Sequence, residues 1–319
     1  MRAPPEGHLA IVAGLLLVLC LATGCGVDPV LHRPNVIAAS PDGSFLVVND
    51  AQAHRLVVLD RDFRLVREIT HPQMVNVWGL WITDSEIIAS NYRTLGVGKT
   101  RAERDALSIL EFLFFDHQGR LLRAWTWEGR KGGLKAAGAF HRDPDGSILI
   151  VDSRQDCVVR FDPQGREAGF IATHGVDPGL LWYPNDIKKT PDGRILVLDE
   201  YNSRLQLFEP DGTFLRVAVG KGETPGTLNF PQFMAFDPQG NLYVTELGTM
   251  RISVFDREFR FQRTMEPPRE SEKDLFQLFG ICLLASPTRV VAVDSLNNKL
   301  YVFDDQGKFL QAVEQARPD

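Results

Sequence analysis

The segment Tyr183–Val219, YPNDIKKTPDGRILVLDEYNSRLQLFEPDGTFLRVAV, contains four short apolar runs separated by three turn signals. Two of these signals are Pro-Asp-Gly triplets, which favour tight reversals of the chain, and the third is a polar loop. Such runs predict β-strands that pair with their sequence neighbours, here at 185–190, 194–198, 204–208 and 213–219. Four antiparallel strands in about 40 residues form one blade of a β-propeller.

Copies of this unit recur along the chain. Three turn glycines, Gly146, Gly193 and Gly240, lie 47 residues apart, and an apolar residue followed by a carboxylate ends six third strands. The sequence therefore predicts an all-β fold, a six-bladed β-propeller of four-stranded antiparallel blades over 35–315, with 316–319 as a tail. The blades are expected at about 35–70, 75–128, 134–175, 180–222, 226–266 and 274–315. Because the last unit holds its own fourth strand, we expect blade faces to close the ring without strand exchange.

Composition and charge restrict the class of partner. The 319 residues are 44% hydrophobic and 24% charged, as in an ordinary globular protein. The net charge of −6 argues against nucleic-acid binding, which requires a basic surface. Even repetition favours one large domain, and we expect a monomer.

The N-terminus predicts export and lipidation. Residues 9–22, LAIVAGLLLVLCLA, form an apolar run that is short for a membrane span but suits a signal peptide, and Thr-Gly-Cys follows. This pattern resembles a bacterial lipoprotein signal, which implies that residues 1–24 are removed, that Cys25 carries lipid and that 25–34 form a linker. The alternative is an uncleaved membrane anchor. We expect a location in the bacterial cell envelope, at the periplasmic face or the outer membrane.

Four segments carry a family resemblance: ILVLDEYNSRLQLFEPDG (195–212), ILIVDSRQDCVVRFDPQG (148–165), LYVTELGTMRISVFD (242–256) and FLVVNDAQAHRLVVLDRD (45–62). They resemble NHL repeats, in which the second strand ends in an acidic residue and Arg opens the third strand. We interpret pairs such as Asp199 and Arg204 as bridges within their own loop. Cys157 occupies the Arg position in the third blade, and we expect Cys157 and Cys282 to be buried apolar residues.

Candidate ligand-binding residues lie where the chain enters each innermost strand, because six such strands converge on one axis. Amide side chains occur there at Asn35, Asn185 and Gln232, and Asp186 follows Asn185. Aromatic candidates on the same face are Trp78, Trp182 and Tyr201, together with Trp81, Tyr183 and Tyr92. Amides and aromatic rings suit a sugar, a peptide, another small neutral ligand or a protein partner, although packing between blades is an alternative role for each Trp. Residues 91–108 enlarge one loop on this face and could form a lid.

Two enzyme families share parts of the pattern. The segment from Leu198 through the start of blade five resembles peptidylglycine amidating lyase, whose zinc is held by histidines, but Gln232 stands where that pattern has His. Pro184-Asn185-Asp186 resembles the calcium-binding segment of gluconolactonase-type propellers, in which Asn and Asp oxygens hold the metal. We expect a non-catalytic binding propeller without a cofactor, and calcium is the ion to test. The alternative is a metal-dependent hydrolase or lyase that uses Asn35, Asn185, Asp186 and Gln232.

Overall fold

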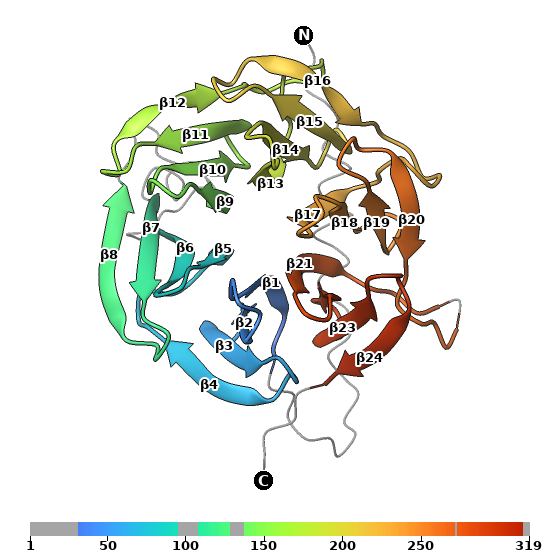
Figure 1. Ribbon diagram of the computed structural model, residues 1–319. Coiled ribbons are helices and arrows are strands. Elements are labelled where there is room, and N and C mark those ends of the chain that lie inside the picture. The colour runs from blue at the N-terminus through green and yellow to red at the C-terminus, as the bar shows by residue number, and fades with distance from the viewer. Residues whose placement is uncertain (1–30, 95–107, 128–136, 272, 315–319) are drawn as a thin grey trace.

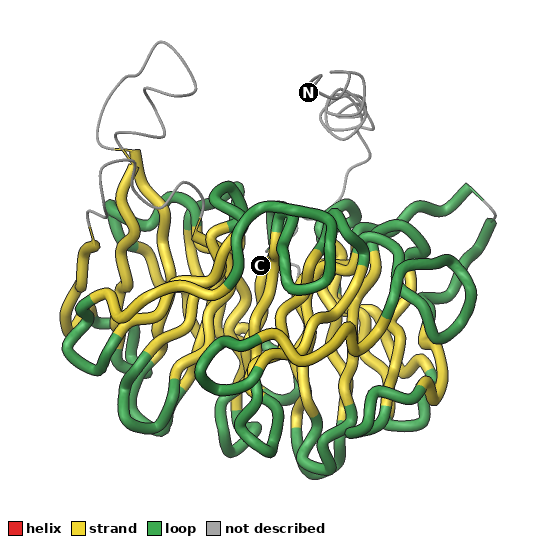
Figure 2. Tube along the Cα trace, turned by 90° about the horizontal axis from the view of Figure 1, so that it is seen from above, coloured by secondary structure: helices red, strands yellow, loops and turns green. Residues whose placement is uncertain are grey.

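The computed structural model describes residues 31–94, 108–127, 137–271 and 273–314, and in these ranges every regular element is a β-strand. The strands form six antiparallel four-stranded sheets placed like blades around one axis (Figure 1). Turned by 90°, the same strands run between the two faces of a disc (Figure 2). The structure thus confirms the all-β six-bladed propeller predicted from the sequence.

Each blade is built of four consecutive strands, and the first strand of each lies nearest the axis. Blade one comprises β1 (Pro34–Ala39), β2 (Phe45–Asp50), β3 (Arg55–Asp60) and β4 (Leu65–Thr70). Blade two comprises β5 (Val77–Ile82), β6 (Ile87–Thr94), β7 (Ser108–Phe115) and β8 (Leu121–Trp127). Blade three comprises β9 (Ala137–Arg142), β10 (Ile148–Asp152), β11 (Cys157–Phe161) and β12 (Glu167–Ile171). Blade four comprises β13 (Pro184–Lys189), β14 (Ile195–Asp199), β15 (Arg204–Phe208) and β16 (Phe214–Val219). Blade five comprises β17 (Pro231–Phe236), β18 (Leu242–Glu246), β19 (Arg251–Phe255) and β20 (Phe261–Met265). Blade six comprises β21 (Leu278–Leu284), β22 (Arg289–Asp294), β23 (Lys299–Asp304) and β24 (Phe309–Val313).

Blade four shows how local sequence makes these strands. Gly193 adopts a φ of +84°, which glycine tolerates without strain, and its N–H donates to the carbonyl of Thr190 at 2.9 Å. At the other end of the hairpin, Asp199 is paired in register with Arg204, and their side chains form an ion pair at 2.8 Å. The corresponding acidic residues and arginines of blades one and five are joined in the same way, at 2.9 Å in both. The predicted loop-bridging role of these pairs is therefore confirmed.

The two faces of the disc differ in their connections. We call the face with the segments that lead into each first strand, and with the second-to-third connections, the loop face. The opposite face, with the tight turns between first and second and between third and fourth strands, is the turn face. Strands β14 and β15 are buried throughout, whereas in β1, β13 and β17 the first four residues are buried and the last two half-buried. The centre of the disc is thus filled near the loop face and open near the turn face.

Neighbouring blades are fastened at the loop-face end. In five junctions a side chain of one blade donates a hydrogen bond to a carbonyl oxygen near the start of the next first strand. The pairs are Asn49 to Val77 (3.0 Å), Ser90 to Gly138 (3.1 Å), Ser153 to Pro184 (2.7 Å), Asn185 to Gln232 (3.0 Å) and Thr245 to Phe279 (2.6 Å). At the sixth junction Gly280 lies against blade one, where a Cβ atom would stand 2.7 Å from the carbonyl oxygen of Asn35.

The ring closes by packing, as predicted. Each sheet of the described chain consists of consecutive strands, so none is shared between the chain ends. Leu31 is fully buried in a cluster that combines residues of blades one and six. The backbone N–H of Arg33 donates to Asn298 Oδ1 of blade six at 2.7 Å. The segment just before blade one therefore seals the seam.

Blade two and the cysteines refine the sequence-based picture. Tyr92 lies within β6, paired with Leu110, and not in a loop as predicted, because the ladder between β6 and β7 continues to Thr94. Trp125 stacks on Phe112 with ring centroids 5.0 Å apart and so packs within blade two. Cys157 and Cys282 are buried, also as predicted.

Two predicted segments lie largely outside the described residues. These are the N-terminal region with Cys25 and residues 95–107 of the expected insertion at 91–108. In the ranges that are described, no helix is long and apolar enough to cross a membrane.

Candidate functional site

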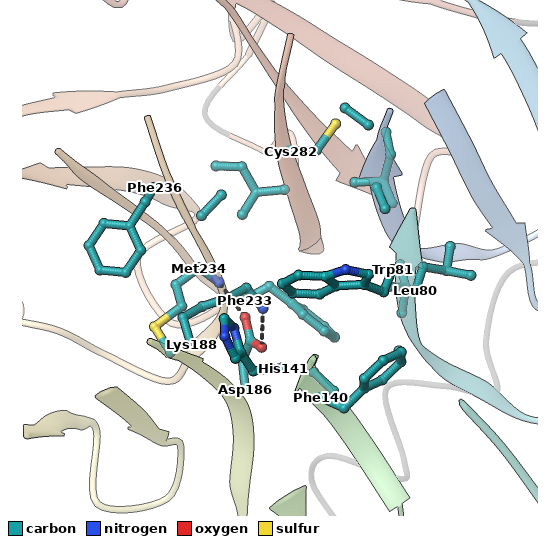
Figure 3. Close-up of a pocket in the computed structure, with 18 of the residues that line it drawn as sticks. Leu80, Trp81, Phe140, His141, Asp186, Lys188, Phe233, Met234, Phe236 and Cys282 are labelled. Carbon is teal, nitrogen blue, oxygen red and sulfur yellow. Dashed lines mark hydrogen bonds and ion pairs between the residues drawn. The ribbon is translucent and has the colours of Figure 1, made fainter. Parts of the chain in front are cut away.

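A cavity of about 380 Å³ opens on the axis between the six first strands (Figure 3). Its size is within the range of about 300–1,000 Å³ that is typical of small-molecule sites. Residues from the third to the sixth position of the first strands line the cavity, and the fifth residue does so in all six blades. The fifth residues form a ring close to the turn face, in blade order Ala38, Trp81, His141, Lys188, Ala235 and Cys282.

This ring is uneven. Blades two, three and four supply an indole, an imidazole and an ammonium group in succession, whereas blades five, six and one supply two alanines and a cysteine. The Trp81 ring meets the His141 ring edge-on at 5.0 Å and lies 6.4 Å from Phe140. The small residues leave space opposite the large ones. The cavity therefore has one side with large aromatic and polar fifth residues, and an apolar side with small fifth residues.

Asp186 lines the cavity next to Lys188 and connects two blades. Its Oδ1 accepts hydrogen bonds from Ile187 N at 2.7 Å and from Lys188 Nζ at 2.6 Å, and its Oδ2 accepts one from Met234 N at 2.9 Å. The side chain is fully buried, and burial raises the pKa of Asp186 while the neighbouring Lys188 opposes that change. With three donors placed on its two oxygens, this carboxyl group stabilises the junction between β13 and β17 (Figure 3).

Lys188 supplies the cationic group of the cavity wall. Its side chain is 24% exposed, and its ammonium donates to Asp186 and, at 3.3 Å, to the carbonyl oxygen of Ile187. An ammonium group has three donors, so one is left for a ligand in the cavity. The adjacent Lys189 forms an ion pair with Asp143 at 2.6 Å.

His141 is a neutral group next to this lysine. Burial lowers the pKa of His141 to about 4, and the positive charges of Lys188 and Lys189 lower it further against the opposing effect of Asp143. Nδ1 of His141 accepts a hydrogen bond from the backbone N–H of Lys189 at 3.4 Å, which places the ring proton on Nε2. At neutral pH the cavity wall therefore carries the ammonium of Lys188 paired with Asp186, the ammonium of Lys189 paired with Asp143, and the uncharged imidazole of His141.

The predicted ligand residues are divided between the two faces. Asp186 lines the cavity. The amides of Asn35, Asn185 and Gln232 are buried near the loop face, where Asn49 Nδ2 donates to Asn35 Oδ1 at 2.7 Å and Gln232 Nε2 donates to the Phe230 carbonyl at 3.1 Å. Trp78 is half-buried against the inner core. Trp182 and Tyr201 lie on the loop face, where Trp182 is 38% exposed. A ligand role for these residues stays a prediction.

The axial cavity lies at the opposite end from the one that the sequence predicts. The expectation of a loop-face pocket assumed that converging strands leave space where they begin. In the structure the amides and the glycine contacts fill that space, and the small fifth residues leave it near the turn face. Trp81 consequently lies beside His141 and far along the strand from the loop-face candidates.

Lys188 and His141 were missed, and a signal for them exists. His141, Lys188 and Ala235 are 47 residues apart, the same interval as the turn glycines. Aligning the blades on this interval places all three at the fifth residue of a first strand. In the described ranges, no group of three or more His, Cys, Asp or Glu residues is placed to hold a metal ion.

Comparison with known proteins identifies the fold. No protein-family model and no curated protein sequence matches the chain. A structure of streptogramin B lyase aligns over 90% of this chain and 84% of its own, with a TM-score of 0.60 and 12% identity. A catalytically inactive virginiamycin B lyase from Staphylococcus aureus, solved with quinupristin, aligns over 92% and 89%, with a TM-score of 0.59 and 13% identity. A functionally unknown protein from Desulfotomaculum acetoxidans aligns over 89% and 86%, with a TM-score of 0.58 and 18% identity. At these identities the likeness is one of fold alone.

Proposed function

We propose that this propeller binds a small molecule with an apolar body and one hydrogen-bond acceptor, such as a carboxylate, in the cavity at its turn face, without catalysis. The observation that carries the proposal is the uneven ring of fifth residues. Trp81 offers an aromatic surface and Lys188 a free donor, and the alanines opposite leave room for the ligand body. An apolar pocket with a few fixed polar groups is typical of small-molecule recognition.

The acid–base groups of the cavity support binding more than chemistry. Both oxygens of Asp186 accept hydrogen bonds within the fold, and Nδ1 of His141 accepts one from the backbone. Groups held in this way present a fixed surface to a ligand, whereas a general base needs a lone pair directed at the proton that it removes.

Benzoate and benzylamine provide a test, because they share a ring and carry opposite charges. We expect the full chain in detergent to bind benzoate, with an affinity at least about tenfold higher than that for benzylamine. Ala235→Leu should reduce the space on the apolar side of the cavity and abolish benzoate binding. Lys221→Met, at an exposed lysine outside the cavity, should leave benzoate binding unchanged. Equal affinities of the two compounds, or unchanged benzoate binding in Ala235→Leu, would contradict the proposal. Calorimetric titration measures the affinities for benzoate and for benzylamine.

Metal dependence separates this function from the alternative. A non-catalytic binder should show the same melting temperature with and without calcium or zinc. A steep rise of the melting temperature in micromolar calcium, by the mass-action stabilisation of a bound ion, would favour a metal-dependent hydrolase or lyase. Turnover of a lactone or ester that is lost in Asn185→Ala would confirm that alternative.

We also propose that lipid on Cys25 holds the propeller at the bacterial cell envelope. The Thr-Gly-Cys sequence after the apolar run supports this placement. Cys25→Ser should move the protein from the membrane fraction to the soluble fraction after cell lysis. Retention of the variant in membranes would indicate an uncleaved anchor.

A further inference from the structure

A second candidate site lies on the loop face of blade four, apart from the axial cavity. Trp182 and Tyr183 precede β13, Tyr201 lies between β14 and β15, and Phe230 precedes β17. We call these four residues the aromatic cluster. The Tyr201 ring stacks on Tyr183 at 4.7 Å and meets Trp182 and Phe230 at 5.6 and 6.3 Å. Trp182 and Phe230 are 38% and 39% exposed, so large apolar rings from three segments gather at one surface.

The angles between the rings favour a ligand that carries a compact, rounded group over a ligand that carries a flat ring. Trp182 is inclined at 70° to Tyr201, and Phe230 at 76°. Rings at steep angles to one another present their faces to a rounded group from several sides, whereas parallel rings receive a flat one. The backbone fixes this geometry, because Tyr183 and Phe230 both precede a proline and both adopt a positive φ, of 54° and 47°. These two rings are held by equivalent turns of the repeat.

Glu200 is the acidic residue that adjoins the aromatic cluster in the chain. It precedes Tyr201 in the chain and is buried, and its side chain hydrogen-bonds with Gln232. Gln232 in turn donates to the carbonyl oxygen of Phe230 at 3.1 Å, so Glu200 is tied to the segment that carries the Phe230 ring. The equivalent residue of blade three is Ser153, whose hydroxyl donates to the next blade. Blade four thus has a carboxyl group where blade three has a hydroxyl group.

No cation of the described residues forms an ion pair with Glu200. Arg204 pairs with Asp199 and donates to the carbonyls of Asp177 and Leu180, and Arg251 pairs with Glu246. His174, which lies 6.1 Å from the Trp182 ring, pairs with Asp156. Among the described residues, the buried carboxyl group of Glu200 therefore has no cationic partner.

We propose that the aromatic cluster and Glu200 bind the quaternary ammonium group of a small molecule. Aromatic faces attract such a cation through their quadrupoles, and the carboxylate balances its charge. The mutually inclined rings of Trp182, Tyr201 and Phe230 suit the round shape of a methylated ammonium. This site is independent of the turn-face cavity, which takes a ligand of opposite charge preference.

Ionisation of Glu200 makes this binding depend on pH. Burial raises the pKa of Glu200 to about 7, with the hydrogen bond from Gln232 opposing that rise. The carboxylate forms as the pH passes through that value, so affinity for the cation should increase with pH. Asp156, Asp199, Glu246, Arg204 and Arg251, the other charged groups on these segments, are held in the ion pairs given above.

Choline and its neutral isostere 3,3-dimethyl-1-butanol form a matched pair of probes. With the full chain in detergent at about pH 8, we expect choline to bind saturably in calorimetric titration, at least about tenfold more tightly than the alcohol. Trp182→Ala and Phe230→Ala should each weaken choline binding by about tenfold or more. Phe170→Ala, which removes an equally exposed ring (41%) on β12, should have no effect. Ala235→Leu should also leave choline binding intact, whatever the outcome for benzoate.

Measurements of choline affinity at different pH values test the role of Glu200. From about pH 8 to pH 6 the choline affinity of the wild type should fall about tenfold, because the ionised fraction of Glu200 falls by about that factor. Glu200→Gln should weaken binding at the higher pH and flatten the profile, whereas His174→Gln should keep most of the pH dependence. Circular dichroism confirms that each variant is folded. Equal affinity for the alcohol, absence of saturable choline binding, or a pH dependence that persists in Glu200→Gln would overturn the proposal.

Discussion

The two ends of the same six inner strands perform different tasks. At the loop-face end, the second residues of the strands are an amide, a glycine or an aromatic residue packed against the next blade, and Asn185 donates to Gln232 across the junction. At the turn-face end, the fifth residues range from alanine to tryptophan and surround a cavity. A single β-ladder thus joins the blades at one end and forms a binding surface at the other.

The difference follows from what each position can tolerate. A residue between two blades must satisfy hydrogen bonds or avoid a clash, and Gly280 has backbone atoms of blade one within 3 Å of where a Cβ would be. A residue that faces the axis near the turn face meets space, so its size and charge can vary without loss of the fold. Function in a propeller can therefore be sought at repeat positions that differ between blades.

Asp186→Ala should give the largest loss of stability, because the Asp186 carboxyl group both lines the cavity and joins blades four and five. The substitution leaves the N–H groups of Ile187 and Met234 without their acceptor and Lys188 without its partner. Removing one partner of a buried pair costs about 3–5 kcal/mol of unfolding free energy. Urea unfolding measures it, with Asp186→Asn, which keeps one acceptor oxygen, as the milder control. A loss of ligand binding with unchanged stability would instead mark Asp186 as mainly a ligand residue.

The two ends should respond to pH in opposite directions. The pKa of Glu200 is raised to about 7 from an ordinary 4.5, so its contribution to stability is complete below about pH 4.5 and is lost as the pH rises through about 7. The pKa of His141 is lowered to about 4 from 6.5, so its contribution is present above about pH 6.5 and is lost as the pH falls through about 4. Each shift corresponds to about 3 kcal/mol of unfolding free energy.

Unfolding free energies of Glu200→Gln and His141→Gln across this pH range check both signs. Relative to the wild type, Glu200→Gln should gain up to about 2 kcal/mol near neutral and higher pH and lose that advantage in acid. His141→Gln should become relatively more stable as the pH falls. A Glu200→Gln difference that stays constant over the range would show that Glu200 ionises alike in the folded and unfolded chain.

Gly280→Ala should be the next most damaging change. The new methyl group would approach the carbonyl oxygen of Asn35 at 2.7 Å and the Cα of Val36 at 2.9 Å, and backbone atoms cannot move aside as a flexible side chain does. Overpacking of this kind costs about 1–3 kcal/mol. Gly220→Ala is the matched control, because a Cβ at that position would meet no atom within 4 Å. Equal melting temperatures of the two variants in thermal unfolding would contradict this account of the junction.

The sequence predicted the fold more completely than the site, for a physical reason. Turn triplets and alternating apolar residues act locally, so β14 was expected at 194–198 and is found at Ile195–Asp199. Asp186 was identified because it follows Asn185 at the entry to a first strand. Which end of the axis stays open depends on the summed volume of side chains from all six blades. The sequence of a single repeat does not predict that sum. Glu200 was missed because its burial arises from Gln232 of the next blade.

Asn185→Ala and Ala235→Leu give the smallest effects and the sharpest contrast between the two ends. Asn185→Ala removes one hydrogen bond between blades four and five, at a cost of about 1 kcal/mol, and should leave benzoate affinity unchanged. Ala235→Leu adds apolar volume to a cavity and should keep the stability while benzoate binding is lost. Stability and ligand affinity would then respond to different ends of the strands. If Asn185→Ala lowered ligand affinity and left stability intact, the loop-face end would bind the ligand, as the sequence suggested, and the division of tasks would fail.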